Sequence, residues 1–321
     1  MLASSRREIR GAPARIAENL KTINEVLDSD AYDAVHLLIS DIFWLMNNVV
    51  LAALFRRSRS VGQMFSFSIL DEGAVLYTSA ELNLKRSIKS LARSAYLFSH
   101  GLPSVLVHNG NSDFRHSLCR AAYCLHPKLL TPTAAVTPSS IDPGHLGELY
   151  GDAFGKLELP PDSSIYISQP LYRRIGLSKQ TRLVLQSCEL LRKQGIKKFY
   201  YKSHHFDTSE WNNILQVECG LEPLPCNFKL PVELWARFCN AEVIVGHYSS
   251  ALLNLKVYGF HGRVIAFGLD KVKQAFHETA QFLAYKEILG NLGCVEMIEP
   301  IAGKEATAPA VPVNSILEDG S

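Results

Sequence analysis

Three groups of polar residues in the sequence have side chains suited to proton transfer and phosphate binding. They are Asp71-Glu72-Gly73, His204-His205 and Ser249-Ser250, and each follows a short, mostly apolar segment. A carboxylate can remove a proton from an attacking hydroxyl, and a protonated histidine can neutralise a leaving phosphate. Serine hydroxyls and unpaired backbone N–H groups bind phosphate. Together these groups fit the transfer of a group from a phosphate-bearing donor to a hydroxyl.

The two serines belong to the stretch 229–259, which is predicted to form a helix, a strand, a tight turn and a second helix. The strand ends at Gly246, and the second helix follows Ser249 and Ser250. Such a turn can bind phosphate, because the N–H groups that open a helix have no partner within it. Serine is also a common helix N-cap, so an ordinary turn explains the same pattern.

The other two groups also have a simpler interpretation. Asp and Gly are common turn residues, so the group at Asp71 fits a polar turn, and a histidine pair after Lys202 fits an exposed loop. Ligands of α/β proteins, however, bind beyond the carboxyl ends of parallel strands. The functional interpretation therefore depends on whether parallel strands precede these groups.

Segments typical of buried strands alternate along the chain with segments of helical periodicity. The predicted strands are 34–39, 65–70, 103–108, 164–167, 198–202, 241–245 and 263–267. The predicted helices are 14–28, 42–55, 79–97, 181–194, 210–219, 233–239, 251–257 and 272–289, with 115–130 helical at first and irregular around His126 and Pro127. This alternation predicts the α/β class with parallel sheets and right-handed crossovers.

A stretch rich in Pro, Ser, Thr and Gly, residues 131–155, separates two such alternating halves. It is the best candidate for an interdomain connection. We therefore expect two Rossmann-like domains over 1–155 and 156–301. The tail 302–321 is rich in Ala, Pro and Ser and is expected to be disordered.

Composition excludes several classes of function. The chain has 321 residues, of which 47% are hydrophobic and 20% charged, as in ordinary soluble proteins. Its formal net charge of +2 gives no reason to expect nucleic acid as a partner. Cys119 and Cys124 lack zinc-site spacing, so no metal is expected. The sequence contains neither a Walker A nor a G-x-G-x-x-G motif, which disfavours P-loop and nicotinamide enzymes.

The seven cysteines are scattered through mostly apolar segments, which indicates reduced thiols in a cytoplasmic protein. The start of the chain lacks the apolar core of a signal peptide. The apolar stretch 34–55 divides into a strand and a helix rather than one membrane span. We expect a soluble protein, and we leave open both peripheral contact with the inner membrane and oligomer formation.

The order of the motifs resembles that of the bacterial sialyltransferases, especially the polysialyltransferase and lipooligosaccharide sialyltransferase groups. In that family a D/E-D/E-G motif is followed by a histidine at a strand end, then by P-x-E and then by S-S. The matching residues here are Asp71-Glu72-Gly73, Lys202-Ser203-His204-His205, Pro231-Val232-Glu233 and Ser249-Ser250.

The resemblance implies a GT-B type architecture of two facing domains and an inverting transfer of sialic acid from CMP-sialic acid, without metal or cofactor. The acceptor would be a cell-surface glycan of the lipooligosaccharide or capsule type, on the side of the first domain. The roles implied are general base for Asp71, assistance to the departing CMP for His204, and ribose binding for Glu233. Ser249 and Ser250 would hold the phosphate, with Gly246 in the same donor site.

The sequence departs from the family pattern in places. His205 stands where the family usually has proline, and residues 1–10 do not read as the family's first strand. The pair His126-Pro127 matches the family's His-Pro motif in residue type, but it follows a predicted helix rather than a strand. His204 is therefore the preferred histidine. Two alternatives remain: a transferase that uses another nucleotide sugar, and a non-catalytic relative that only binds.

Overall fold

The computed structural model describes residues 6–29, 32–40, 45–71, 74–77, 84–105, 116–130, 136–144, 157–225, 231–273 and 279–300. In these ranges the chain forms two parallel sheets, one in each half. The expected α/β class with parallel sheets is thereby confirmed. No helix within the described ranges is both long and apolar enough to cross a membrane.

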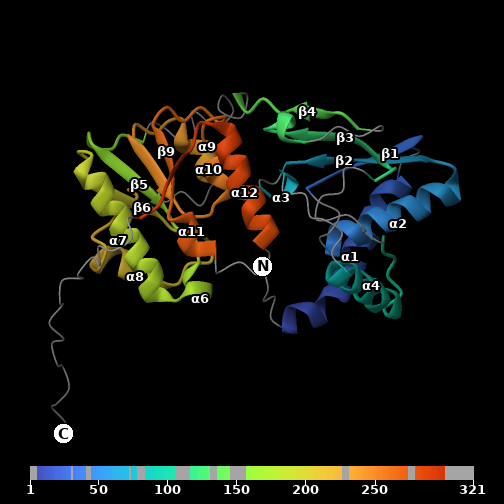
Figure 1. Cartoon of the computed structure of the whole chain (residues 1–321). Coiled ribbons are helices and arrows are strands. Elements are labelled where there is room, and N and C mark those ends of the chain that lie inside the picture. Colours follow the sequence, from blue (N-terminus) through green and yellow to red (C-terminus); the bar gives the residue numbers. More distant parts are fainter. Residues whose placement is uncertain are drawn as a thin grey trace, which may run out of the picture.

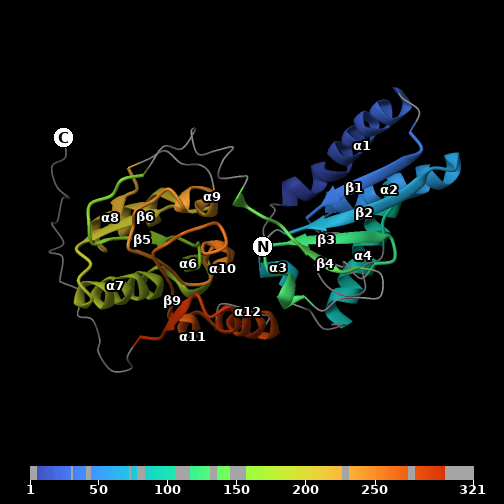
Figure 2. The ribbon, with the colours of Figure 1, turned by 90° about the horizontal axis from the view of Figure 1, so that it is seen from above.

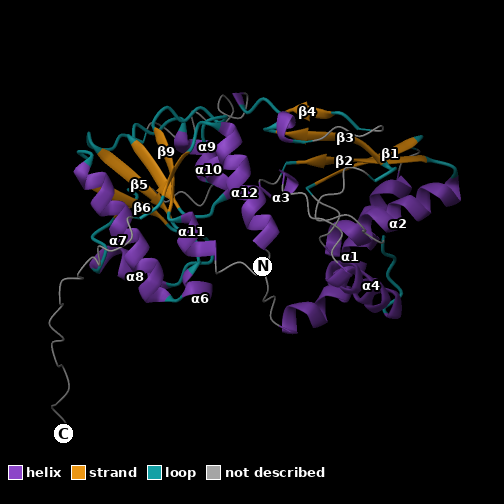
Figure 3. Ribbon diagram, in the orientation of Figure 1, coloured by secondary structure: helices purple, strands orange, loops and turns teal. Residues whose placement is uncertain are grey.

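The first sheet has four strands in sequential order. They are β1 (Ala34–Ile39), β2 (Met64–Leu70), β3 (Cys119–Cys124) and β4 (Pro138–Ser140), all parallel. The helices of this half are α1 (Arg6–Ser29), α2 (Leu45–Val61), the short α3 (Ala74–Tyr77) and α4 (Leu84–Ser99). Right-handed crossovers between sequential strands put every connecting helix on the same face. Accordingly α1, α2 and α4 lie below the sheet in Figures 1 and 3.

The other face of this sheet carries polar side chains. On β2, Phe67 and Ile69 are buried toward the helices, whereas Ser66 and Ser68 alternate with them. The His36 ring on β1 lies over both serines, with Nδ1 2.8 Å from the Ser66 hydroxyl and Nε2 3.0 Å from the Ser68 hydroxyl. Apolar and polar side chains thus alternate along β2 with the period of two that a strand imposes, and Ser68 is buried although it is polar.

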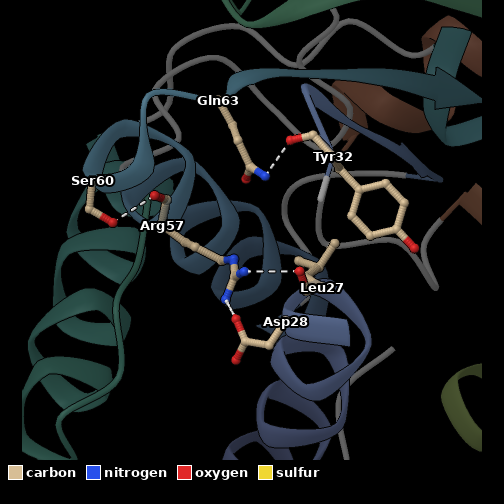
Figure 4. A network of polar contacts seen from close by, with 6 residues as sticks. All are labelled: Leu27, Asp28, Tyr32, Arg57, Ser60 and Gln63. Atoms are coloured by element: carbon tan, nitrogen blue, oxygen red, sulfur yellow. Dashed lines mark hydrogen bonds and ion pairs between the residues drawn. The ribbon is translucent and has the colours of Figure 1, made fainter. Parts of the chain in front are cut away.

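Polar contacts fix α1 against α2 at the outer edge of this half (Figure 4). The Arg57 guanidinium donates to the Leu27 carbonyl over 3.2 Å and lies 2.7 Å from the Asp28 carboxylate. The Ser60 hydroxyl donates to the Arg57 carbonyl, and the Gln63 amide donates to the Tyr32 carbonyl. The last turn of α2 thus holds the carboxyl end of α1.

The second sheet has six parallel strands in the order β10-β9-β8-β5-β6-β7. The strands are β5 (Ser163–Ile167), β6 (Lys198–Lys202), β7 (Glu222–Pro223), β8 (Val243–Gly246), β9 (Arg263–Phe267) and β10 (Glu296–Ile298). The helices are α6 (Tyr172–Ile175), α7 (Leu177–Lys193), α8 (Ser209–Val217), α9 (Val232–Ala236), α10 (Ser250–Asn254), α11 (Leu269–Val272) and α12 (Thr279–Leu292).

Helices cover both faces of the second sheet. On β5, Tyr166 packs in a cluster with Val184 of α7 and Trp211 of α8. Its neighbour Ile165 packs in a different cluster, with Leu252 of α10 and residues of α9 and α12. All five residues of β5 are buried, as expected for a central strand of a doubly covered parallel sheet.

The cores of the two halves are continuous. Leu76 and Tyr77 of α3 belong to the same buried cluster as Leu253 of α10 and Phe282 of α12. Helix α3 packs against α12, and Figure 1 shows α3 between the first sheet and α12. Packed side chains therefore join the halves beside the end of β2.

The structure corrects several predicted elements. Segment 115–130 was predicted to start as a helix, but it forms β3 and then a 3-10 turn at Pro127–Leu129. Cys119, Ala122 and Tyr123 pair with β2, and Cys124 pairs with β4, so the segment is a strand between two others rather than a helix. The predicted connection 131–155 contains β4, and β10 was not predicted. Residues 103–105 have no regular structure, while 106–108 and the tail 302–321 lie outside the described residues.

Candidate functional site

Asp71 follows β2 and is held by its neighbours on β3 and α3. Its carboxylate Oδ2 accepts hydrogen bonds from the Tyr77 hydroxyl and, over 3.0 Å, from the Leu125 N–H. The Tyr77 oxygen in turn accepts the N–H groups of Leu125 and His126, both at 3.1 Å. Burial, and then the charge of Asp71, raise the pKa of Tyr77 well above its usual range. The Tyr77 phenol therefore keeps its proton and donates it in a hydrogen bond that orients the Asp71 carboxylate. The other two residues of this motif, Glu72 and Gly73, lie outside the described residues.

His126 lies beside this acidic corner and reaches the other half of the chain. Its ring packs edge-on against Tyr77, with centroids 5.5 Å apart, and its Nε2 is 3.2 Å from Oδ1 of Asn254 on α10. Because an amide oxygen only accepts, this contact assigns the proton to Nε2. The sequence disfavoured His126-Pro127 because a helix was predicted before it. With β3 in place of that helix, His126 follows a strand end next to Asp71.

His204 follows β6, and its hydrogen bonds in the described part of the chain lie within its own loop. Its N–H donates to Asp207 Oδ2 over 2.8 Å, and its ring Nδ1 accepts the Phe206 N–H over 3.2 Å. The ring stacks on His205 at 4.2 Å. Burial, followed by the charges of His205, Lys202 and Arg173, lowers the pKa of His204 to about 4. The ring is therefore neutral near pH 7, whereas the sequence-based expectation was a cation.

Glu233 is a half-buried carboxyl on the short helix α9. Glu233 is in the first turn of α9, after Pro231 as N-cap residue. Burial raises the pKa of the Glu233 carboxyl, and the nearby Lys202 ammonium opposes that rise. Burial, Glu233 and Asp71 in turn raise the pKa of Tyr258. Two acidic groups from different halves thus raise the pKa of one phenol, and the charge of Lys202 lowers the pKa of both Glu233 and His204.

Ser249 is buried and almost fully hydrogen-bonded. Its hydroxyl oxygen accepts the Ala251 N–H as N-cap of α10, over 3.3 Å, and the Gln169 side-chain amide over 3.0 Å. Its backbone N–H and carbonyl are both paired with the Tyr285 hydroxyl of α12, at 3.2 and 2.7 Å. A hydroxyl has two acceptor positions and one donor. With both acceptor positions used, the Ser249 hydroxyl is left to act as a donor, which suits an anion.

The Gln169–Ser249 hydrogen bond spans the point where the second sheet changes direction. Gln169 follows β5 and Ser249 follows β8, its neighbour in the sheet, while β6 lies on the other side of β5. Open parallel sheets bind ligands at such a topological switch point. Ser250 opens α10 and is half-buried, and Gly246 is the last, buried residue of β8. A Cβ at Gly246 would meet only ordinary contacts at 3.5 Å or more, so glycine is not required there for space.

His247 is a buried histidine between Gly246 and the serines. Its Nδ1 is 2.7 Å from the Phe267 carbonyl, so Nδ1 carries the proton, and its Nε2 has no partner among the described residues. Burial lowers the pKa of His247 to about 4, which the hydrogen bond to Phe267 only partly opposes. The ring is therefore neutral in the folded protein near pH 7.

The structure thus connects Asp71, through Tyr77 and His126, to Asn254 of α10. The charges of Asp71 and Glu233 both raise the pKa of Tyr258. The residues that the sequence did not single out are mostly partners of these groups. Tyr77, Asn254, Tyr258 and Tyr285 have no motif of their own. Asn254 is four residues after Ser250, so helical spacing places both on one face. Among the described residues, no three His, Cys, Asp or Glu side chains gather as a metal site would require.

No family model matches this sequence, and no curated protein matches it. Among solved structures, the chain is similar to an alpha/beta-galactoside alpha-2,3-sialyltransferase from the luminous marine bacterium Photobacterium phosphoreum. The identity is 11% and the TM-score 0.49, over 88% of this chain and 84% of that one.

It is also similar to a UDP-forming alpha,alpha-trehalose-phosphate synthase from Burkholderia vietnamiensis. Here the identity is 11% and the TM-score 0.39, over 89% of this chain and 73% of the other. Likenesses this low carry no argument about the function of the chain.

Proposed function

We propose that this chain is an inverting, metal-independent glycosyltransferase that moves sialic acid from CMP-sialic acid to a hydroxyl of a cell-surface glycan. The observation that carries the proposal is a chain of contacts between the two halves beside two of the motifs. Tyr77 bonds Asp71 and packs against His126, and His126 bonds Asn254 of α10, the helix that Ser249 caps. The two-sheet arrangement also agrees with the GT-B architecture.

The donor would bind at the switch point of the second sheet. The Ser249 hydroxyl, whose acceptor positions are filled by Ala251 and Gln169, would donate to a phosphate oxygen of CMP, with Ser250 beside it. Glu233 would hold the ribose, because a carboxyl group can bond two vicinal hydroxyls. In this assignment the donor side lies in residues 156–301 and the acceptor side in residues 1–155.

Charge near the donor supports a phosphate at this place. The ends of β8, β5 and β6 are neighbours in the sheet, and adjacent strands lie about 5 Å apart, so the ends of β6 and β8, which His204 and Ser249 follow, are about 10 Å apart. The charges of Lys202 and Arg173 act on His204 and would attract the phosphate. Because Nδ1 of His204 accepts the Phe206 N–H, the neutral ring carries its proton on Nε2 and can donate that proton in a hydrogen bond.

Asp71 would act as the general base. The proton of the acceptor hydroxyl passes to the Asp71 carboxylate while the acceptor oxygen bonds to the anomeric carbon of sialic acid. The bond from that carbon to the phosphate oxygen breaks, and its electron pair leaves with CMP. Attack from the face opposite the phosphate inverts the configuration. Tyr77 and the Leu125 N–H would hold the carboxylate in position for this step.

A direct assay tests the proposal. Purified protein is incubated with CMP-sialic acid and either lactose or sialylated lactose, and both the sialylated product and the released CMP are quantified. We expect product formation with at least one acceptor and no loss of activity in EDTA. Absence of both transfer and CMP release with every acceptor would overturn the proposal.

A thermal-shift panel of CMP, CDP, UDP and GDP tests the choice of donor. A nucleotide that binds only the folded state raises the melting temperature with its concentration. We expect CMP to give the largest shift. A larger shift with UDP or GDP would indicate another nucleotide sugar, and a CMP shift without turnover would indicate a chain that only binds. The proposal also includes a cytoplasmic location and an acceptor of the lipooligosaccharide or capsule type.

A further inference from the structure

His204 begins a tight turn that connects β6 to α8. The Asp207 N–H donates to the His204 carbonyl over 2.9 Å, and the His204 N–H donates back to Asp207 Oδ2 over 2.8 Å. Within this turn the Phe206 N–H donates to Nδ1 of the His204 ring over 3.2 Å. Three hydrogen bonds therefore hold the backbone and the ring of His204, and one of them needs the carboxylate of Asp207.

The Asp207 carboxylate is attached to the buried end of β5. Burial raises the pKa of Asp207, and a hydrogen bond from the Ser168 hydroxyl is the largest of the effects that oppose this rise. The Ser168 oxygen in turn accepts the Trp211 Nε1–H over 2.8 Å, and both residues are buried. Trp211 belongs to α8, on the side of the second sheet that faces away from the first half (Figures 1 and 2). The turn is thereby fixed to the core of the second half.

The other oxygen of this carboxylate makes fold stability a poor explanation of Asp207. Its Oδ1 is out of contact with solvent and has no hydrogen-bond partner among the described residues. A buried acceptor without a donor costs stability, and the cost is larger for a charged group. This cost offsets what the hydrogen bonds of the carboxylate contribute. The contact with His204 is a better explanation of the side chain.

The residue after His204 shows why the turn needs such a contact. Proline usually stands there in the family that the motifs resemble, and a proline restricts the backbone of the residue before it. His205 imposes no such restriction. Its ring stacks on the His204 ring at 4.2 Å, which does not determine which nitrogen of His204 carries the proton. The hydrogen bond to Asp207 restrains the same backbone by another route.

We propose that Asp207 is a positioning residue for His204. By binding the His204 N–H, its carboxylate keeps the turn in which the Phe206 N–H occupies ring Nδ1, so that the ring proton stays on Nε2. The Nε2–H is the group that would bond the phosphate of the donor, and this part of the inference rests on the proposed function. The tautomer does not rest on it, because it follows from the turn alone.

Nitrogen-15 NMR of the histidine rings tests the tautomer in the absence of any donor. The full chain is labelled at its 11 histidines, and the His204 signals are identified by their loss in His204→Gln. Near pH 7 the wild type should give one protonated and one unprotonated ring nitrogen for His204, without averaging. Asp207→Leu, which has a similar shape but accepts no hydrogen bond, should give averaged signals from mixed tautomers. Asp207→Asn, whose amide oxygen can accept the His204 N–H, should restore the wild-type signals.

Calorimetric titration with CMP tests the consequence for the donor. Asp207→Leu should raise the CMP dissociation constant about tenfold and Asp207→Asn less than about twofold, because one hydrogen bond to a charged phosphate is weakened only in the first. Glu287→Leu, at an exposed position of α12, is the matched control and should have wild-type spectra and affinity. Rescue by Asp207→Asn distinguishes positioning from general destabilisation. If Asp207→Leu does not fold, Asp207→Ala takes its place with the same expected results.

Two spectra would overturn the inference. One is the wild-type pair of His204 signals in Asp207→Leu, and the other is averaged signals already in the wild type. Mixed tautomers in Asp207→Leu with wild-type affinity for CMP would overturn the link between Asp207 and the donor. If the tautomer responds as expected but the wild type does not bind CMP, the proposed donor site is wrong and the positioning of His204 by Asp207 is supported.

Discussion

The two sheets of this protein differ in order and in cover, and the difference assigns them different tasks. The first sheet runs β1-β2-β3-β4 in chain order and carries helices on one face. The second runs β10-β9-β8-β5-β6-β7 and carries helices on both. Only the second order, among the described strands, contains a point where the chain reverses direction across the sheet. A doubly wound sheet binds its ligand there, whereas a sequentially ordered sheet has no such crevice.

This comparison separates binding from chemistry. Ser249 and Gln169 meet at the switch point of the second sheet, whereas Asp71 is held by Tyr77 and β3 of the first. If the assignment is right, changes in the second half alter donor affinity, and changes in the first half alter turnover. The predictions that follow separate these two quantities.

Asp71→Asn should have the largest effect. Removing the proposed base should lower kcat about 10³-fold, within the usual range for general base catalysis, while the CMP dissociation constant stays unchanged. Initial rates and calorimetric titration with CMP measure the two quantities. Asp142→Asn, on a turn of the same half, is the matched control and should keep wild-type kcat. A loss of CMP affinity in Asp71→Asn as large as its loss of kcat would contradict the separation.

Acid should weaken the folded state through His247 at the end of β8. An unfolded histidine takes up its proton near pH 6.5, but burial lowers the pKa of His247 to about 4. Between about pH 4 and pH 6.5 the unfolded state therefore binds more protons than the folded state. The contribution of His247 to the free energy of unfolding is fully present above about pH 6.5 and is lost as the pH falls to about 4. The loss from this group is about 3 kcal/mol. The free energy of unfolding is measured by urea titration above about pH 6.5 and near pH 4. His247→Asn keeps a donor toward Phe267, and its loss of unfolding free energy between these pH values should be smaller than that of the wild type by about 3 kcal/mol. A loss equal to that of the wild type would contradict the role of His247.

Ser249→Ala should weaken donor binding. It removes one hydrogen bond to a charged phosphate, worth about 1.5–3 kcal/mol, so the CMP dissociation constant should rise about 10- to 100-fold. Saturated kcat should change less than this. Ser60→Ala, at the end of α2, is the control and should bind CMP as wild type. If calorimetry gave the same CMP dissociation constant for Ser249→Ala and Ser60→Ala, the switch point would not be part of the donor site.

A pair of tyrosine variants gives the smallest but sharpest comparison. Tyr77→Phe removes a donor to Asp71 and should lower kcat about tenfold without changing CMP affinity, as expected for the loss of one hydrogen bond to a charged group. Tyr285→Phe removes both contacts to the Ser249 backbone and should raise the CMP dissociation constant by a similar factor instead. In this pair, Tyr77→Phe changes kcat and Tyr285→Phe changes the affinity for CMP. General destabilisation would instead lower the melting temperature of both variants without separating these two quantities.

Strands were largely predictable from the sequence because buried parallel strands are short apolar runs. β1, β6 and β9 have the predicted bounds, and β2 and β5 start one residue earlier than predicted. Segment 115–130 was not predictable in the same way. CRAAYC has no regular alternation of apolar and polar residues, and its strand structure comes from pairing with β2 and β4 rather than from local preference.

The sequence could locate strand ends but not the neighbours that act on them. His126 was disfavoured because the segment before it was predicted to be a helix, whereas it forms β3. Because of that error, the contacts of His126 with Tyr77 and Asn254 could not be predicted. The neutral state of His204 follows from burial and nearby cations, which spacing along the chain cannot reveal. The combined effect of Asp71 and Glu233 on the pKa of Tyr258 became visible only once both halves were placed, because the two acidic residues come from different halves.

A crystal structure of the protein with CMP tests the central claim most directly. The account predicts that a phosphate oxygen lies within hydrogen-bond distance of the Ser249 hydroxyl, at the switch point between β5 and β8, with the ribose against Glu233. Asp71 should remain bonded to Tyr77 and out of contact with the nucleotide. CMP bound along the first sheet, or bound with its ribose out of reach of Glu233, would contradict the account.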